Sequence, residues 1–393
     1  MPNLRKSLGI TFLASNGATV INFLVTIVLA RLLTPADIGI FSIAYVLVSV
    51  AHIFRDFGVT TYLVQEKDLT PEKIRSISGV LFASSWTTAT ILYSLTGLAA
   101  DFYNQPGVEK VIEVLALSFV FIPFGAITHN LLTRELKARE QAIASILGVT
   151  VFATSSVLLA WLGFGYMTMA WASLLNIVAT AIAYLPYRPK YAPWLPSFRG
   201  WGNVIHFSGG VLFSNTIREL NNSLPDVALG KLSGPHGVGI MSRANSTSNL
   251  FNMIAGPTVG YAVLPVLSEK HHAGEPIAEP MSKAIAYLTG LAWPAVLGTA
   301  IFAEPIILFL YGEQWIESAP LVRIICAIAF INTPFTFTIL ALQAIGRPYL
   351  AAIPGAFQLV FSAGAILMLF DQTLASFAYA MLAANLATVP IYL

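Results

Sequence analysis

The feature that most constrains this chain is a succession of apolar runs, each long enough to cross a lipid bilayer. A transmembrane helix needs about 20 apolar residues, and about twelve segments of the sequence meet that requirement. We therefore expect the chain to cross a membrane many times. The predicted spans cover residues 8–33, 38–57, 77–100, 111–131, 142–164, 166–185, 204–230, 238–267, 284–311, 319–342, 348–370 and 373–393.

The composition supports this interpretation and predicts the fold class. Charged residues make up 10% of the chain and hydrophobic residues 56%, whereas a soluble domain carries about 25% charged residues. Open strands cannot satisfy their backbone groups in lipid, and the sequence lacks the alternating pattern of a membrane barrel. We therefore predict an all-α membrane protein.

The distribution of Lys and Arg predicts the orientation in the membrane. Most of the 21 basic residues fall in the loops on one side of the predicted spans. The alternate loops hold only Arg31, Lys110 and Lys231. Cytoplasmic loops carry an excess of Lys and Arg, so the N-terminus is predicted to lie in the cytoplasm. The apolar run after Met1–Lys6 is too long for a signal peptide and is interpreted as the first span.

A turn near the start of the chain recurs 200 residues later without a gap. Residues 29–42 read LARLLTPADIGIFS, and residues 229–242 read LGKLSGPHGVGIMS. Each copy is a short polar turn between two apolar runs, and the two share a basic residue, a proline and a glycine at matching positions. This frame predicts an internal duplication.

The duplication predicts two six-helix lobes, with residues 1–186 forming the first and residues 204–393 the second. Residues 187–203, rich in proline, basic and aromatic residues, form the predicted cytoplasmic linker. Six spans return the chain to the same side, so the lobes are expected to be related by a pseudo-two-fold axis along the membrane normal. The chain ends at Leu393 directly after an apolar run, and we expect the second lobe to be truncated there.

The most polar predicted span is the seventh, at residues 204–230. Asn215, Arg218, Asn222 and Asp226 follow helical spacing and share one face. Ionisable groups are costly in lipid, so they tend to face a lumen or a partner. One interpretation is a hydrated face that lines a central cavity and offers Arg218 to an anion. The alternative is an internal network of these side chains, and the two are compatible.

Four further residues are candidates to line that cavity. Asn22 in the first span matches Asn222 in the duplication, although a hydrogen bond between packed helices would explain either amide equally well. His52 and Arg55 lie near the cytoplasmic end of the second span, where Arg55 can also extend to water. Arg243 lies about a turn inside the outer end of the eighth span.

Motifs for catalysis, nucleotides or metals are absent from the sequence. It contains no HExxH, no P-loop and no GxSxG, and it has a single cysteine, Cys326. The chain also has no basic cluster that would bind nucleic acid. We expect a transporter rather than an enzyme, with no cofactor. A coupling ion, H⁺ or Na⁺, remains open.

Several short motifs resemble those of a known family. They are RLLTPADIG at 31–39, LVQE at 63–66, DVALGK at 226–231, VGIMSRA at 238–244 and LYGEQW at 310–315. In order and spacing they are similar to the oligosaccharide flippases, or Wzx-type polysaccharide exporters, of the multidrug/oligosaccharidyl-lipid/polysaccharide superfamily.

The resemblance implies a flippase of the bacterial inner membrane. Such proteins carry undecaprenyl-diphosphate-linked oligosaccharide from the cytoplasmic to the periplasmic leaflet by alternating access, in the synthesis of O-antigen, capsule or exopolysaccharide. Polysaccharide polymerase and assembly proteins would be partners. Arg218 is then the first candidate for the diphosphate, and Asn22, Asn215 and Asn222 are candidates for sugar hydroxyls. A multidrug or small-solute antiporter of the same superfamily is the alternative.

Overall fold

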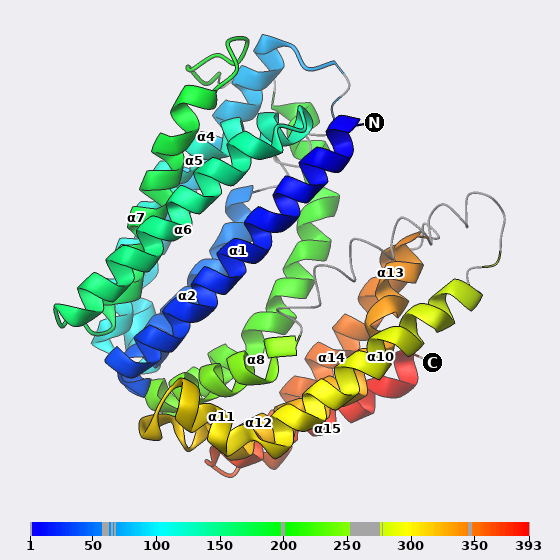
Figure 1. The fold of residues 1–393 in the computed structure, drawn as a ribbon. Helices are drawn as coiled ribbons and strands as arrows, with labels where there is room; N and C mark the ends of the chain where they lie inside the picture. Colours follow the sequence, from blue (N-terminus) through cyan, green and yellow to red (C-terminus); the bar gives the residue numbers. More distant parts are fainter. Residues whose placement is uncertain are drawn as a thin grey trace. The chain divides into compact units, whose positions relative to one another are not determined.

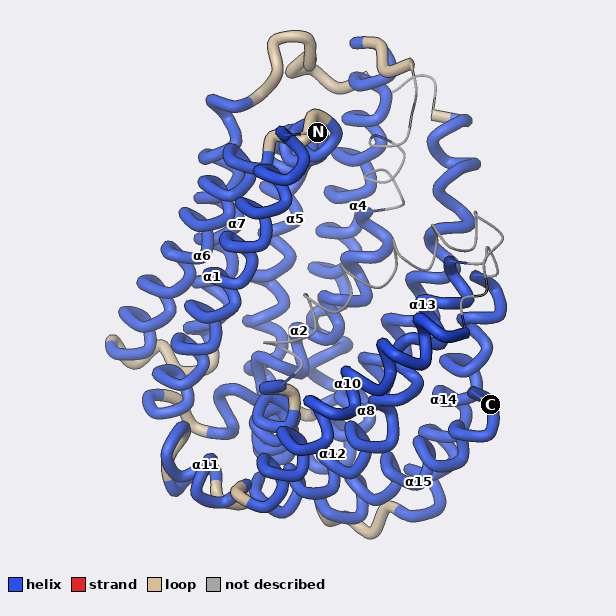
Figure 2. Tube along the Cα trace, turned by 45° about the vertical axis from the view of Figure 1, so that its right-hand side comes forward, coloured by secondary structure: helices blue, strands red, loops and turns tan. Residues whose placement is uncertain are grey.

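The computed structural model describes residues 2–56, 63, 66, 68–197, 201–251, 276, 278–344 and 348–392. In these ranges every regular element is an α-helix or a short 3-10 helix, as Figure 2 shows. The predicted all-α class is therefore confirmed. Contacts divide the chain into two compact units, Met1–Glu219 and Leu220–Leu393. The lobe boundaries and the linker predicted from the sequence stay predictions.

Unit 1 is built from long helices that run side by side (Figure 1). Helix α1 packs on α6, α6 on α7, and α7 on α5, while α5 also contacts α2 and α4. A 3-10 turn, Leu185–Tyr187, follows α7. The helices are α1 (Pro2–Leu32), α2 (Pro35–Asp56), α4 (Pro71–Tyr103), α5 (Pro106–Arg134), α6 (Ala138–Trp161), α7 (Met167–Tyr184) and the first part of α8 (Gly202–Ser248).

Unit 2 holds the rest of α8 and a second set of helices. Helix α12 packs on α10 and α15, and α15 packs on α14. Amide and hydroxyl groups link these helices, since Asn332 donates to Asn385 at 2.7 Å and Thr388 donates to Gln358 at 2.6 Å. The helices are α10 (Ala278–Ile301), α11 (Ala303–Leu310), α12 (Ser318–Asn332), α13 (Thr336–Ala344), α14 (Pro348–Leu369) and α15 (Leu374–Tyr392).

The duplicated turn interrupts the helical backbone at matching positions in its two copies. In the first copy α1 ends at Leu32 and α2 begins at Pro35. The Thr34 hydroxyl accepts from the Asp37 N–H at 3.2 Å, and the Asp37 carboxylate accepts from the Thr34 N–H at 3.1 Å. This reciprocal cap satisfies two helix N–H groups.

In the second copy the break lies inside α8, at Gly234. Its φ of 68° and ψ of −173° interrupt the helix directly before Pro235. This backbone conformation is essentially restricted to glycine. Thr34 and Gly234 hold the same place before the shared proline, where the α conformation is disfavoured.

Two spans that the sequence predicts as continuous are interrupted in the structure. The span at 284–311 is divided at Phe302, between α10 and α11. The span at 319–342 is divided by a 3-10 turn, Thr333–Phe335, between α12 and α13. Pro305 and Pro334 lie in the first turn of the element that follows each break, where a proline needs no N–H partner.

Among the described residues eight helical segments are long and apolar enough to cross a membrane. They belong to α1, α2, α5, α6, α7, α10, α12 with its continuation to Thr338, and α15. The protein is thus a multi-pass membrane protein. The predicted number of about twelve spans stays a prediction.

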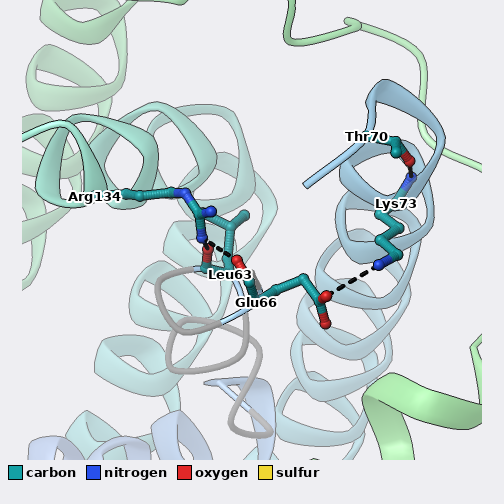
Figure 3. A network of polar contacts seen from close by, with 5 residues as sticks. All are labelled: Leu63, Glu66, Thr70, Lys73 and Arg134. Atoms are coloured by element: carbon teal, nitrogen blue, oxygen red, sulfur yellow. Dashed lines mark hydrogen bonds and ion pairs between the residues drawn. The ribbon is translucent and has the colours of Figure 1, made fainter. Parts of the chain in front are cut away.

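One end of unit 1, which we call the linker end, gathers the start of α4, the end of α5 and residues 185–197. Figure 3 shows how Arg134 of α5 contacts Leu63 and Glu66 there. Its guanidinium donates to the carbonyls of Leu63, at 3.3 Å, and Glu66. The Glu66 carboxylate pairs with Lys73 of α4 at 2.9 Å. Glu66 is therefore tied to both α4 and α5, and Leu63 to α5.

Residues 188–197 also pack closely on the linker end. The Ser197 N–H donates to the Arg75 carbonyl at 2.8 Å, and Arg75 donates back to the Leu195 carbonyl at 3.2 Å. A Cβ on Gly79 would lie 1.9 Å from the Ser197 carbonyl oxygen, so only glycine permits this approach. Arg188 lies over the Trp194 ring, 4.4 Å from its centroid.

Candidate functional site

Unit 1 contains a cavity of about 650 Å³ between α1, α5, α6 and α7. This volume falls in the range of small-molecule sites, about 300–1,000 Å³. We call it the polar cavity because nine of its lining residues carry a polar side chain. Those nine are Ser15, Thr19, Asn22, His129, Gln141, Ser145, Asn176, Thr180 and Tyr184.

Each helix brings its polar residues to the cavity through helical spacing. On α7, Asn176, Thr180 and Tyr184 are each four residues apart and therefore lie on one face. On α1, Ser15, Thr19 and Asn22 follow the same kind of spacing. Polar groups in a membrane helix that share a face and point into a cavity indicate a hydrated site.

Hydrogen bonds fix part of this lining. His129 Nδ1 and the Tyr184 hydroxyl are 2.9 Å apart and link α5 to α7. The Gln141 amide donates to the His129 carbonyl at 3.1 Å and to the Thr133 hydroxyl at 2.6 Å. These bonds hold one wall of the cavity in place.

Other groups remain available to a ligand. The Thr180 hydroxyl donates to the Asn176 side-chain oxygen, Oδ1, at 3.2 Å, which leaves the Asn176 Nδ2 donors available. Within the part of the chain that the structure describes, neither the Asn22 amide nor the Ser145 hydroxyl makes a hydrogen bond. The cavity therefore offers both donors and acceptors.

Two glycines let α7 approach its neighbours closely. A Cβ on Gly148 of α6 would lie 2.1 Å from the Thr180 hydroxyl and 2.5 Å from the Asn176 side-chain oxygen. A Cβ on Gly125 of α5 would lie 3.1 Å from the Ala181 Cα. Gly125 lines the cavity, and Gly148 lies against two lining residues, Thr180 and Asn176. A side chain at either glycine would therefore push α7 away from its neighbours.

The polar cavity carries little charge. Among the described residues that line it, none is Asp, Glu, Lys or Arg. The apolar part of the lining is made largely of small residues, such as Ala14, Ala18 and Ala142. The polar groups that the described lining offers are thus amides, hydroxyls and one imidazole.

A second hollow lies further along the same two helices, α1 and α6. It is lined by apolar side chains except for one threonine: Ile21, Leu24, Val25, Val28, Ala153, Thr154, Val157, Leu158 and Trp161. Helices α1 and α6 therefore change from a polar to an apolar lining within a few turns. The polar cavity is a local feature and does not extend along the whole groove.

The structure places one of the candidates from the sequence in the polar cavity, Asn22. The side chains of Asn215, Arg218 and Asn222 lie outside the described residues, so their roles stay predictions. Asp226 is half-buried in α8.

The remaining candidates lie in other surroundings. His52 stacks on Phe119 of α5, with ring centroids 4.5 Å apart. Arg55 is half-buried, and its carbonyl accepts from the Ser84 hydroxyl at 2.8 Å. Arg243 is only 7% exposed and lies 5.7 Å from the ring centroids of both Tyr311 and Trp315. These positions give His52 and Arg243 aromatic packing partners, and whether they touch a substrate stays a prediction.

Most residues that line the polar cavity were not among the candidates predicted from the sequence. His129 lies in the cavity lining and was not among the candidates predicted from the sequence. The signal that could have revealed the site is the stripe of Asn176, Thr180 and Tyr184 in an otherwise apolar span. Its polar groups are uncharged, whereas the candidates came from spans with ionisable groups and from the duplication.

The comparisons with known proteins agree with this architecture. A sequence profile described as polysaccharide biosynthesis protein matches residues 28–320. The succinoglycan biosynthesis transport protein ExoT of Rhizobium meliloti is 24% identical over 87% of this chain and 69% of its own length. The lipopolysaccharide biosynthesis protein WzxC of Escherichia coli is 21% identical over 78% of this chain and 63% of its own.

A third relative shares this similarity. The teichuronic acid biosynthesis protein TuaB of Bacillus subtilis is 21% identical over 77% of this chain and 63% of its own length. The chain thus spans roughly two thirds of the length of these relatives.

Solved structures show the fold. The lipid II flippase MurJ, in an inward closed conformation, superposes with a TM-score of 0.81 at 12% identity over 97% of this chain and 86% of its own. An inward-facing multidrug resistance MATE family transporter of the MOP superfamily gives 0.76 at 16% identity over 95% and 92%. The helical fold is thus that of MOP superfamily transporters, and the resemblance of the motifs is confirmed: the chain belongs to the polysaccharide biosynthesis protein family.

Proposed function

We propose that the protein is a lipid-linked oligosaccharide flippase. It moves undecaprenyl-diphosphate-linked sugar units from the cytoplasmic to the periplasmic leaflet of the bacterial inner membrane, by alternating access, for surface polysaccharide synthesis. The observation that carries this proposal is the polar cavity, a site of about 650 Å³ with nine polar lining residues within four membrane helices. The relatives' names, which refer to succinoglycan, lipopolysaccharide and teichuronic acid, support the same class of substrate.

The physical problem of such a substrate matches this site. A sugar headgroup loses its hydrogen bonds to water in hydrocarbon, and each unreplaced bond costs several kcal/mol, about 4–8 on a cyclohexane scale. Amide and hydroxyl side chains such as Asn22, Ser145 and Asn176 can replace those bonds while the prenyl chain stays in lipid. The cavity thereby lowers the barrier without any chemical reaction, as expected of a transporter rather than an enzyme.

The diphosphate requires a cation, which the described lining of the polar cavity lacks. Arg218 in the second half of the chain remains the first candidate for this role, with Asn215 and Asn222 beside it on the predicted face. Arg218→Ala is expected to abolish polymer export without lowering the amount of protein in the membrane. Normal export by that variant would remove Arg218 from the mechanism.

The orientation follows the charge distribution, with the N-terminus in the cytoplasm. The linker end, which holds Arg75, Arg134 and Arg188, then faces the cytoplasm. The cytoplasmic leaflet is where a lipid-linked oligosaccharide is loaded, and a polymerase or assembly protein on the other side would receive it. Cysteine accessibility at Lys110 and Arg75 tests this orientation, since only a cysteine at position 110 should react from the periplasm.

A multidrug antiporter of the same superfamily is the competing function. It would need a coupling carboxylate deep in one lobe, and no carboxylate lines the described part of the polar cavity. Asp226 remains available for that role. If oligosaccharide export in vesicles persists after proton and sodium gradients are collapsed, an antiport scheme is wrong.

The proposed function is tested by complementation in a bacterium that lacks its own flippase. The chain should restore surface polysaccharide and remove the lipid-linked oligosaccharide that accumulates in the cytoplasmic leaflet. Protein that reaches the membrane but leaves this accumulation unchanged would contradict the proposal.

A further inference from the structure

We infer that the polar cavity is a subsite for an uncharged sugar ring of the transported oligosaccharide, and that it selects against sugars that carry an ionised group. This inference rests on the proposed function and makes it more specific. It places the sugar between α1, α5, α6 and α7 of unit 1. The cation that the diphosphate requires is not among the described lining residues.

The first argument is the inventory of hydrogen-bonding groups. A sugar hydroxyl both donates and accepts, so it is best met by groups that do the same. Amides and hydroxyls have this dual character, and Asn22, Ser145 and Asn176 present such groups without a competing partner for the Asn22 amide, the Ser145 hydroxyl or the Asn176 Nδ2 among the described residues. Carboxylates or cations alone would offer only one kind of partner.

The second argument is the charge of the lining. A uronic acid would bring a carboxylate into a site where no described lining residue is Lys or Arg. Within the membrane an ionised group without a counter-ion is costly, whereas a neutral ring loses only hydrogen bonds that the site can restore. The same lining that accepts a neutral sugar therefore rejects an anionic one.

The third argument is the shape. The missing side chains of Gly125 and Gly148 let α7 pack closely against α5 and α6. This packing fixes where the Asn176 and Thr180 side chains lie in the cavity wall. The short side chains of Ala14, Ala18 and Ala142 leave room beside them and offer apolar surface to the C–H faces of a ring. The pair formed by His129 and Tyr184 at 2.9 Å limits the cavity on another side.

The test measures binding of three probes to the purified chain in detergent. The probes are prenyl diphosphate, prenyl-diphosphate N-acetylglucosamine and prenyl-diphosphate glucuronic acid. The unmodified protein should bind the N-acetylglucosamine probe more tightly than the other two. Equal affinity for all three would overturn the subsite, and equal or tighter binding of the glucuronic acid probe would overturn its selectivity.

Two substitutions locate the subsite. Asn22→Ala and Asn176→Ala should each weaken binding of the N-acetylglucosamine probe about ten-fold, as expected for a lost hydrogen bond, and leave prenyl diphosphate unchanged. Thr150→Ala is the matched control, because Thr150 is exposed on α6 and donates only to its own helix at Ile146. An equal loss for both probes in either variant would overturn the assignment.

A third variant changes shape without removing a polar group. Gly148→Ala must displace Thr180 and Asn176, so it should weaken binding of the N-acetylglucosamine probe selectively. Gly17→Ala adds the same methyl group on α1 where nothing lies within 4 Å, and it should bind like the unmodified protein. If Gly148→Ala folds and binds the sugar probe normally, the sugar does not occupy this cavity.

The outcomes also separate this inference from the proposed function. If the unmodified protein restores surface polysaccharide but these variants bind the sugar probe normally, only the subsite is wrong. If the unmodified protein neither restores the polymer nor binds any probe, the proposed function itself fails.

Discussion

Gly234 shows how a single residue fixes the second copy of the duplicated turn. Its φ of 68° and ψ of −173° are essentially restricted to glycine, and a Cβ there would meet no atom within 4 Å. Any effect of Gly234→Ala would therefore be backbone strain alone. We expect that substitution to destabilise the protein by about 1–3 kcal/mol.

The measurement is the thermal unfolding temperature of the purified chain in detergent, compared with Gly97→Ala. Gly97 lies within α4 with open space around it, so alanine there should raise the unfolding temperature through its helix propensity. Opposite shifts for the two variants are predicted. A Gly234→Ala protein as stable as the unmodified chain would contradict the assigned backbone conformation.

Glu135 gives the linker end a pH dependence. Burial alone would raise the pKa of its carboxyl, but hydrogen bonds from Lys137 and Tyr191 and the charge of Lys137 together lower that pKa below the ordinary 4.5. Because the folded-state pKa is lowered, the stabilisation is present above pH 4.5 and is lost as the pH falls through the lowered value.

The unfolding temperature of the unmodified chain should therefore decrease as the pH falls below about 4.5. Glu135→Gln removes the ionisable group, and its unfolding temperature should decrease less over the same range. Identical pH profiles for the two proteins would show that Glu135 contributes no pH-dependent stability.

At the level of elements, the close packing of residues 188–197 on α4 depends on the absence of a side chain at Gly79. A Cβ would lie 1.9 Å from the Ser197 carbonyl oxygen, so the backbone of the segment must move. We expect Gly79→Ala to break the hydrogen bond from Ser197 to Arg75. Limited proteolysis should then cleave residues 188–197 faster than in the unmodified chain.

Gly97→Ala is the matched control for this prediction, because it adds the same methyl group to the same helix in open space. It should leave the cleavage rate unchanged. Equal cleavage of both variants would indicate that Gly79 does not determine how the segment packs.

The sequence predicted the helices better than it predicted the site. Long apolar runs indicated the helices α1 to α7 with boundaries within about six residues, since only hydrogen bonding within a helix satisfies its backbone groups in lipid. The breaks at Phe302 and at Thr333–Phe335 were not predicted, because prolines such as Pro123 also occur within an unbroken helix. Tertiary packing decides which proline ends a helix.

Uncharged polar residues explain why the cavity was missed. Thr154 and Ser155 donate to carbonyls of their own helix, at Thr150 and Val151, and need no other partner. The Asn176 side-chain oxygen accepts from Thr180, whereas its Nδ2 donors have no partner among the described residues. From the sequence alone these residues look alike, because a hydroxyl or amide in an apolar helix is compatible with either arrangement. Asn22 was identified because the duplication paired it with Asn222.

At the level of the whole molecule, the fold leaves two functions open. The chain superposes on a lipid flippase and on a multidrug transporter with TM-scores of 0.81 and 0.76. A shared fold does not imply a shared substrate. The chemistry of the site must distinguish them, and the polar cavity offers amides and hydroxyls rather than a described carboxylate.

The most direct test of the flippase assignment is transbilayer movement in vesicles that contain only the purified chain. Lipid-linked oligosaccharide placed in one leaflet should become accessible to a sugar-modifying enzyme on the other side, and Asn22→Ala with Asn176→Ala should slow this exchange. A chain that exports a cationic drug under an imposed proton gradient, yet leaves the lipid-linked sugar in its original leaflet, would contradict the assignment.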